Sequence, residues 1–191
     1  MFCYERNYAE FLKKLYKNAT IDVPEIDDNE AETISKAIFD YFGKRSQNCV
    51  EKRVYAYNIL IKTVVELNYG CVSACAFVSR DSSSITLWFL IKEFNRNIQV
   101  ILANYLNMIS ELTEYGAFVI DEYSGFVKYV YSYNIENKSF CERTFRKYLV
   151  CCLSEINSYY EELICYCVGH IPTNAKKKFL KMIRETLEEI S

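Results

Sequence analysis

The stretch 115–133 constrains the fold most, because apolar and aromatic side chains fill most of its positions. These are Tyr115, Phe118, Val119, Ile120, Tyr123, Phe126, Val127, Val130, Tyr131 and Tyr133, with few polar residues between them. A helix that is apolar around most of its circumference must be surrounded by other helices, because water on any side would cost too much free energy. We therefore predict that residues 115–133 form a buried central helix. A strand competes with this prediction only over residues 127–133, because strict alternation of apolar and polar residues is scarce elsewhere.

The length and composition of the chain are those of a folded domain. The chain has 191 residues, 51% of them apolar, with only 5 Gly and 2 Pro. This composition excludes disorder, argues against a loop-rich β protein, and suffices for one domain with a core of its own. The net charge of −2 gives no general reason to expect a nucleic-acid partner.

The nine cysteines do not fall into a metal-binding pattern. The close pairs are Cys71 with Cys75, Cys151 with Cys152, and Cys165 with Cys167, and none has the Cys-x-x-Cys spacing of a zinc site. The chain opens without an apolar signal segment and has no apolar run that could span a bilayer. We therefore expect reduced thiols, a cytoplasmic location, and neither a metal nor another cofactor.

Helical periodicity recurs along the rest of the chain. A first amphipathic helix is predicted within residues 1–20, with a stripe formed by Tyr4, Tyr8, Phe11, Leu12, Leu15 and Tyr16. Further helices are predicted over 34–42, over 50–64 with an end near Gly70, over 84–112, where a break near Asn95 is open, over 140–167 and, after a break at 169–172, over the amphipathic stretch 173–191. The apolar stretch 71–78 is open between helix and strand. The prediction is an all-α, single-domain helical bundle over residues 1–191, with about eight or nine helices.

Three short motifs resemble those of the Bcl-2 family. Residues 34–42 (Ile-Ser-Lys-Ala-Ile-Phe-Asp-Tyr-Phe) resemble its first-helix motif, and residues 60–67 are similar to its death motif, keeping Leu60, Glu66 and Leu67. Tyr115-Gly116 stands where that family has an aromatic residue and glycine, although Ala117 replaces the family's Arg. The resemblance covers residues 30–165 and lacks the late Trp motif and the membrane anchor, as virus-encoded members do.

That resemblance implies a non-enzymatic protein–protein interaction module that restrains host apoptosis or innate-immune signalling. Its partner would be a pro-apoptotic death-motif helix or a signalling adaptor, held in a groove between helices, and homodimerisation is also open. The groove residues that the resemblance implies are Val64, Leu67, Trp88, Phe89, Phe94, Leu102 and Tyr105 in the walls and Tyr115, Gly116 and Val119 in the floor. Ordinary core packing is the alternative for each of them.

Three other functions remain open from the residues alone. A helical adaptor of unrelated fold could act through an exposed aromatic patch or by dimerisation. A thiol-dependent activity would use Cys165 or Cys167 with His170, the single histidine. Nucleic-acid binding would use residues 175–190, where Lys176, Lys177 and Lys178 are consecutive. Glu155, Glu161 and Glu162 are expected to form a solvated helix face.

Overall fold

A computed structural model describes residues 28–45, 50–80, 83–135 and 140–170. The elements in chain order are α2 (Asp28–Arg45), β1 (Glu51–Val54), β2 (Asn58–Leu67), β3 (Gly70–Ser79), β4 (Ser84–Glu93), the short 3₁₀ helix η1 (Arg96–Ile98), α3 (Gln99–Ser110), β5 (Ala117–Asp121), β6 (Phe126–Asn134) and α4 (Glu142–Cys167). In this part of the chain no helix is long and apolar enough to cross a membrane.

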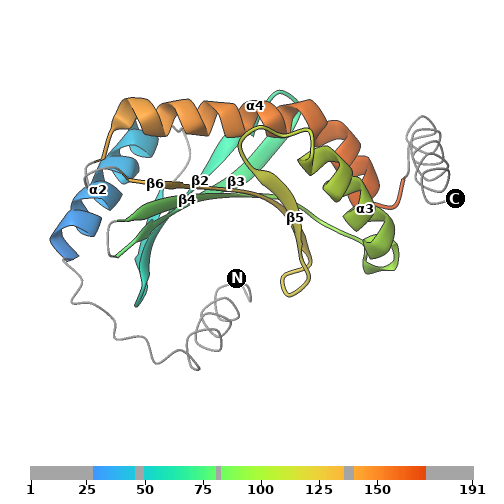
Figure 1. Ribbon diagram of the computed structural model, residues 1–191, viewed down its shortest axis with the longest axis horizontal. Helices are drawn as coiled ribbons and strands as arrows, with labels where there is room; N and C mark the ends of the chain where they lie inside the picture. The colour runs from blue at the N-terminus through green and yellow to red at the C-terminus, as the bar shows by residue number, and fades with distance from the viewer. Residues whose placement is uncertain (1–27, 46–49, 81–82, 136–139, 171–191) are drawn as a thin grey trace, which may run out of the picture.

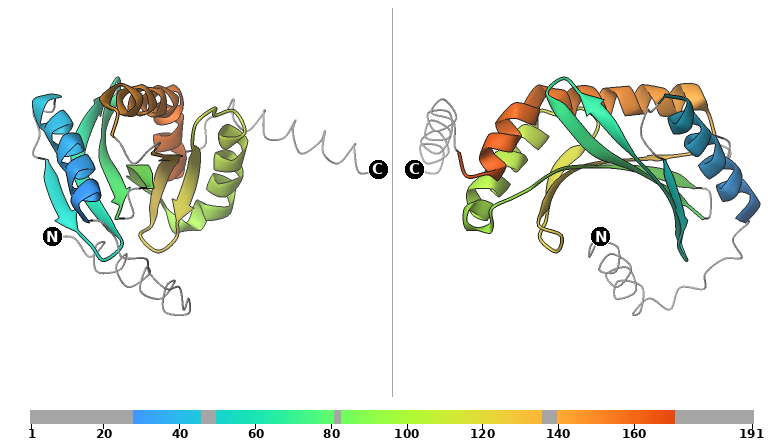
Figure 2. Two further views of the ribbon diagram at one scale, coloured as in Figure 1. Left: turned by 60° about the vertical axis from the view of Figure 1, so that its left-hand side comes forward. Right: turned by 180° about the vertical axis from the view of Figure 1, so that it is seen from behind.

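The six strands form one antiparallel sheet in the order β1-β2-β3-β4-β6-β5. The sheet arches, and helices α2, α3 and α4 lie along its convex side (Figures 1 and 2). The interior strands β2, β3 and β4 each have ten residues, whereas the edge strands β1 and β5 have four and five. The described chain therefore has two layers, a curved sheet and a helical layer on one of its faces.

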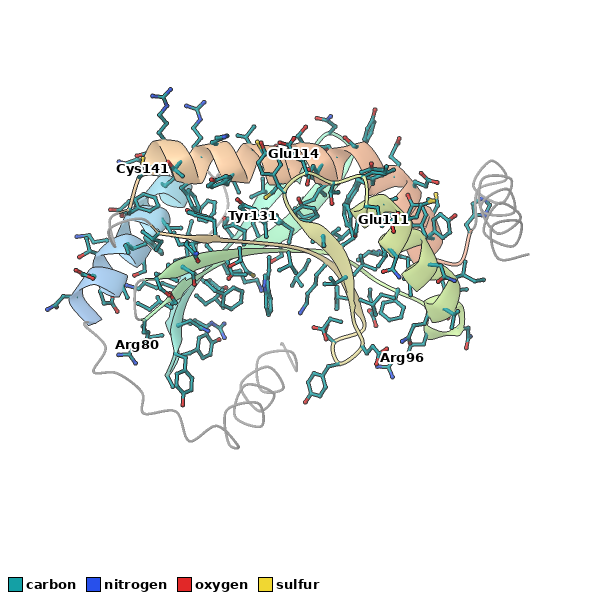
Figure 3. The ribbon with its side chains drawn as sticks, in the orientation of Figure 1. Arg80, Arg96, Glu111, Glu114, Tyr131 and Cys141 are labelled. Atoms are coloured by element: carbon teal, nitrogen blue, oxygen red, sulfur yellow. The ribbon has the colours of Figure 1, made fainter. Side chains whose placement is uncertain are left out.

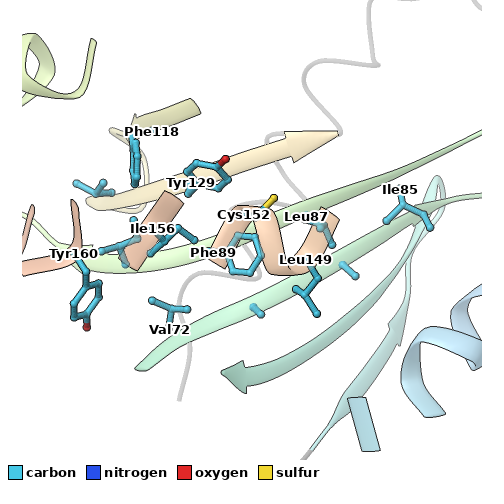
Figure 4. Packing of buried hydrophobic residues seen from close by; sticks show 14 of the residues in the cluster. Val72, Ile85, Leu87, Phe89, Phe118, Tyr129, Leu149, Cys152, Ile156 and Tyr160 are labelled. Carbon is cyan, nitrogen blue, oxygen red and sulfur yellow. The ribbon is translucent and has the colours of Figure 1, made fainter. Parts of the chain in front are cut away.

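The main core lies between these two layers. Every second residue of a strand points to the helices, as in Val72, Ala74, Ala76 and Val78 of β3, all of them at most 2% exposed. Helix α4 lays a stripe at three- and four-residue spacing on these strands, formed by Phe145, Leu149, Cys152, Ile156, Tyr160 and Leu163. Figure 4 shows Leu149, Cys152 and Ile156 among Leu87, Phe89 and Tyr129 of the sheet.

The prediction of a buried central helix over residues 115–133 was wrong. This stretch is the hairpin of β5 and β6, with Phe118 opposite Tyr129 and Ile120 opposite Val127. Aromatic and β-branched side chains suit a pleated strand, and a strand with apolar neighbours on both faces gives an almost continuous apolar run that looks like a buried helix. The hairpin turns at Gly125, whose φ of 74° lies in the left-handed region. The competing strand over 127–133 is what forms.

The all-α fold class and the helix over 50–64 were wrong for the same reason. Residues 50–64 supply β1 and most of β2, the open stretch 71–78 lies in β3, and Trp88 lies in β4. Helices are confirmed over 34–42, 99–110 and 142–167, in α2, α3 and α4. The first half of the helix predicted over 84–112 was wrong, because residues 84–93 form β4. Three α-helices and η1 thus replace the eight or nine helices in the part of the chain that is described. The helices predicted within 1–20 and over 173–191 lie outside it.

The resemblance to the Bcl-2 family is contradicted by this architecture. The death-motif-like residues 60–67 lie on the sheet strand β2, and Tyr115-Gly116 leads into strand β5 instead of starting a central helix. Short apolar motifs recur in unrelated folds, because both helices and strands need apolar faces. The inference of a role in apoptosis or innate immunity depended on that resemblance and falls with it.

Candidate functional site

The candidate site is the concave face, the side of the sheet that points away from α2, α3 and α4. None of the described helices lies on it (Figures 1 and 2). The strand register assigns to this face Leu60, Lys62 and Val64 of β2; Ser73, Cys75 and Phe77 of β3; Thr86, Trp88 and Leu90 of β4; Lys128 and Val130 of β6; and Ala117, Val119 and Asp121 of β5. We use "concave face" for this set of residues.

The centre of the concave face is apolar. Leu60, Cys75 and Phe77 form a second cluster of buried side chains, 7%, 7% and 8% exposed, against which Tyr55 and Trp88 pack. The ring centroids of Phe77 and Trp88 are 4.5 Å apart at an interplanar angle of 53°. An apolar cluster on the sheet face away from the helices is unexpected in a protein with one core, because a free sheet face is usually polar.

An ion pair between a buried lysine and a half-buried aspartate lies beside this cluster. Lys128 is only 4% exposed, and its Nζ donates a hydrogen bond to the carboxylate of Asp121 on the neighbouring strand. The same Nζ lies 4.3 Å from the centroid of the Trp88 ring, within range of a cation–π interaction. The other Asp121 oxygen accepts hydrogen bonds from the backbone N–H groups of Tyr123 at 3.1 Å and Ser124 at 3.2 Å.

The electrostatics of this pair keep the Asp121 carboxylate ionised and bound to Lys128. Burial raises the pKa of the Asp121 carboxyl, but the hydrogen bonds of Lys128 and Ser124 together outweigh burial and hold the pKa below its ordinary value. A carboxylate stabilised in this way is a poor general base. The chain described has no group of three or more His, Cys, Asp or Glu side chains that could hold a metal ion. The concave face therefore presents an apolar centre beside an ion pair that hydrogen bonds hold in place.

The structure does not bring the ten predicted groove residues together. Val64, Trp88 and Val119 lie on the concave face. Leu67, Phe89, Phe94, Leu102 and Tyr105 pack in or against the main core on the opposite side, and Tyr115 and Gly116 lie in the turn before β5. A groove between helices is thus not formed by this set, because the residues divide between two faces of a sheet. Arg96 lies in η1, toward the opposite end of the arch from Arg80 (Figure 3).

Gly116 does permit a close approach, but to the protein itself. A Cβ atom there would lie 2.5 Å from the Val130 carbonyl oxygen and 2.6 Å from the Tyr129 ring. The Gly116 N–H donates to the Tyr129 hydroxyl at 2.8 Å. Its role is therefore to let the chain pass over Tyr129, not to admit a ligand.

Glu155 was expected on a solvated helix face and instead joins three elements. Its carboxylate accepts hydrogen bonds from the backbone N–H groups of Glu114 at 2.6 Å and Tyr115 at 3.1 Å, and from the Tyr129 hydroxyl. Burial, with this hydrogen bond to Glu155, raises the pKa of Tyr129 above its ordinary value. The carboxylate ties α4 to β6 and to the turn after α3. No sequence signal marks this role, because the partners are backbone groups about forty residues away.

The thiol-dependent site finds little support in the geometry. Cys167 is 1% exposed, and burial raises the pKa of its thiol to about 11, whereas a nucleophilic cysteine needs a lowered pKa. The His170 backbone N–H donates to the Cys165 carbonyl at 2.8 Å, which ends α4. Residues 175–190, considered for nucleic-acid binding, lie outside the described residues.

The described chain thus defines a two-layer α/β protein, with three α-helices on one face of an antiparallel six-stranded sheet. No protein-family model and no curated protein matches its sequence. A solved chain from the HopA1-SchA chaperone–effector complex is similar, with a TM-score of 0.47 and 14% identity over 71% of this chain and 98% of that one. Another, from the ExsC-ExsE complex, has a TM-score of 0.43 and 11% identity over 70% of this chain and 95% of that one. With both scores below 0.5, neither likeness assigns a family or partner to this protein.

Proposed function

We propose that this protein is a non-enzymatic interaction module that binds an apolar or amphipathic segment of a protein partner on its concave face. The observation that supports it most directly is the buried cluster of Leu60, Cys75 and Phe77 with Trp88, on the face away from every described helix. Beside this cluster Val119 is 38% exposed on the same face, and apolar side chains left outside the main core commonly mark a protein-binding site.

The chemistry around the cluster suits such a partner. Aromatic side chains contribute much of the energy of protein interfaces, and Trp88 stands near the middle of the face, on β4 between β3 and β6. The Lys128–Asp121 pair beside it is fixed and hydrogen-bonded, so it does not demand a charged ligand. The partner segment would place apolar side chains against Trp88, Val64 and Val119.

A matched set of valines tests the proposal. Val64 and Val119 lie on the concave face, whereas Val150 lies on the outer surface of α4 and is 55% exposed. A photo-reactive amino acid at each position, in cells that produce the protein, should cross-link one and the same protein from positions 64 and 119 but not from 150. Mass spectrometry of the cross-linked peptides identifies the partner and its segment.

Binding of that purified partner then decides the proposal. Val64→Asp and Val119→Asp should each raise the dissociation constant at least tenfold, a loss of about 1.4 kcal/mol of binding free energy, because a charge is forced against an apolar contact. Val150→Asp should leave it unchanged. Equal cross-linking from position 150, or affinities unaffected by both concave-face substitutions, would refute the proposal.

The proposal includes a reducing, cytoplasmic setting. Within the described residues Cys71, Cys75, Cys141, Cys151, Cys152, Cys165 and Cys167 are free thiols. Several are buried apolar side chains in the core, a common use of cysteine where disulfides do not form.

A further inference from the structure

We propose that the N-terminal segment of the same chain, residues 4–17, docks on the concave face and is the occupant that a partner must displace. This inference rests on the proposed function only in taking the concave face as a docking surface. Three observations point to it: the depth of burial on that face, the amphipathic pattern of the segment, and the short distance over which the chain must reach.

The low exposure of the apolar cluster on the concave face indicates that a further segment packs over it. Leu60, Cys75 and Phe77 are only 7–8% exposed, yet α2, α3 and α4 all lie on the other side of the sheet. Neighbouring side chains on an arched sheet shield one another in part, and Tyr55 and Trp88 do so here. Burial comparable to that of the main core on a face with no described helix is what an additional apolar segment would produce.

The N-terminal segment has the matching chemistry. Tyr4, Tyr8, Phe11, Leu12, Leu15 and Tyr16 recur at helical spacing and would form one apolar stripe. Glu10 and Lys17 fall on the side opposite the stripe, at about 100° of rotation per residue. An isolated helix of this length is marginal in water, so the stripe requires a surface to pack on. An aromatic stripe matches a face built around Phe77 and Trp88.

The chain is long enough to make the connection. Helix α2 begins at Asp28, and the ion pair of Glu32 with Lys52 places its first turns beside the edge strand β1. Residues 18–27 can span about 33 Å when extended. From the edge at β1 to β4 the distance across the sheet is about 14 Å, at roughly 4.8 Å per strand. The linker can therefore pass around β1 and bring the stripe over the apolar cluster.

The single tryptophan makes the docking measurable in the full-length protein. Trp88 is the only tryptophan of the chain, so its fluorescence reports on the concave face alone. The test variant is Phe11→Ser with Leu15→Ser, and the matched control is Glu10→Ser with Lys17→Ser. Each pair introduces two serines and leaves the net charge unchanged.

The test variant should shift Trp88 emission to longer wavelength and raise its quenching by acrylamide severalfold, with the control like wild type. Alkylation of Cys75 should accelerate in the test variant, while Cys71, an exposed residue of the same strand, serves as the internal reference. Unchanged quenching and unchanged Cys75 reactivity in a folded test variant would overturn the inference. The valine experiments above would still stand, because they do not depend on the segment.

A second measurement avoids substitutions that weaken folding. Benzoylphenylalanine in place of Phe11 keeps an aromatic side chain, and on irradiation it should cross-link within one chain to peptides of β2, β3 or β4. Cross-links to the helical layer would overturn the proposal. So would cross-links between two chains, or a wild-type dimer that the test variant dissociates, because the occupant would then be a second copy.

Discussion

Lys128 shows at the scale of one residue how the concave face combines burial with charge. Its ammonium group is held by Asp121 and lies over the Trp88 ring, with 4% of the residue exposed. Removing one partner of such a pair leaves the other charge buried without compensation, which costs more than the pair itself contributes.

Asp121→Asn should therefore reduce the free energy of unfolding by about 1–3 kcal/mol at pH 7. Because the pKa of Asp121 is lowered in the folded state, its contribution is complete above the unfolded pKa of about 3.9 and is lost as the pH falls through the folded value. Urea denaturation from pH 7 to pH 3 should show wild type and variant converging at the acid end. Glu51→Gln, in the exposed pair with Arg53, is the control and should change stability little. A difference that persists unchanged at pH 3 would contradict this account.

Tyr129→Phe isolates the hydroxyl that joins β6 to Glu155 and Gly116. The residue is fully buried, and its hydroxyl both donates and accepts a hydrogen bond. Its loss should cost about 1–3 kcal/mol, because the Gly116 N–H loses its acceptor and Glu155 loses a donor. Thermal unfolding measures this, and Tyr123→Phe, at a residue 53% exposed, should be neutral. A neutral Tyr129→Phe would mean that water replaces the hydroxyl.

The cysteine just before α4 and the one at its end should differ sharply in reactivity. Cys141 is exposed before the first turn of α4, and hydrogen bonding with Thr144 lowers the pKa of its thiol, whereas burial raises that of Cys167 to about 11 (Figure 3 shows Cys141). At pH 7 the thiolate fraction of Cys167 would be about one in ten thousand. Iodoacetamide labelling followed by peptide mass spectrometry should modify Cys141 and spare Cys167 in the native protein. Rapid labelling of Cys167 would revive the thiol-dependent alternative.

At the scale of elements, two glycines give opposite expectations. Gly116→Ala would place a methyl group 2.5 Å from the Val130 carbonyl oxygen. Because backbone atoms cannot easily move aside, the free energy of unfolding should fall by about 1–3 kcal/mol. Gly43 lies in α2 with nothing within 4 Å of an added Cβ. Gly43→Ala should therefore stabilise by about 0.5–1 kcal/mol through helix propensity. Denaturant unfolding of both variants checks the signs, and equal effects would contradict the packing described for the β5 turn.

The elements also show what could be predicted from the sequence. The helices α2, α3 and α4 were predictable because each has one apolar face and one solvent-exposed polar face, which gives a clear helical periodicity in the sequence. The strands were not, because in β2 and β3 both faces carry apolar residues, such as Ile61 on one side and Leu60 on the other. Strand alternation is hidden where both faces are apolar.

The same cause explains the errors in the candidate site. Trp88, Val64 and Val119 share the concave face of the sheet, whereas the prediction placed them in a groove between helices. The pairing that brings them to one face joins residues that are distant in sequence, β4 with β6 and β6 with β5. Periodicity within one segment carries no information on which segments pair.

For the whole molecule, the two proposals together predict a competition. If the N-terminal segment occupies the concave face, a partner binds only the fraction of molecules in which that face is open, so its apparent dissociation constant is raised by the inverse of that fraction. The Phe11→Ser, Leu15→Ser variant should bind the cross-linked partner more tightly than wild type, and the Glu10→Ser, Lys17→Ser control should not. Titration calorimetry measures both, and weaker binding by the test variant would mean that the segment helps to hold the partner.

The outermost strands of the sheet are also its shortest, with four residues in β1 and five in β5 beside interior strands of nine or ten. Each edge of the sheet therefore exposes only a few backbone donors and acceptors, too few for a strand of another molecule to pair with it stably. We therefore expect the edges of this sheet, although its strands are rich in β-branched and aromatic residues, to resist fibril formation. Lengthening β1 by insertion of alternating valines and threonines should reduce its solubility before it alters its fold.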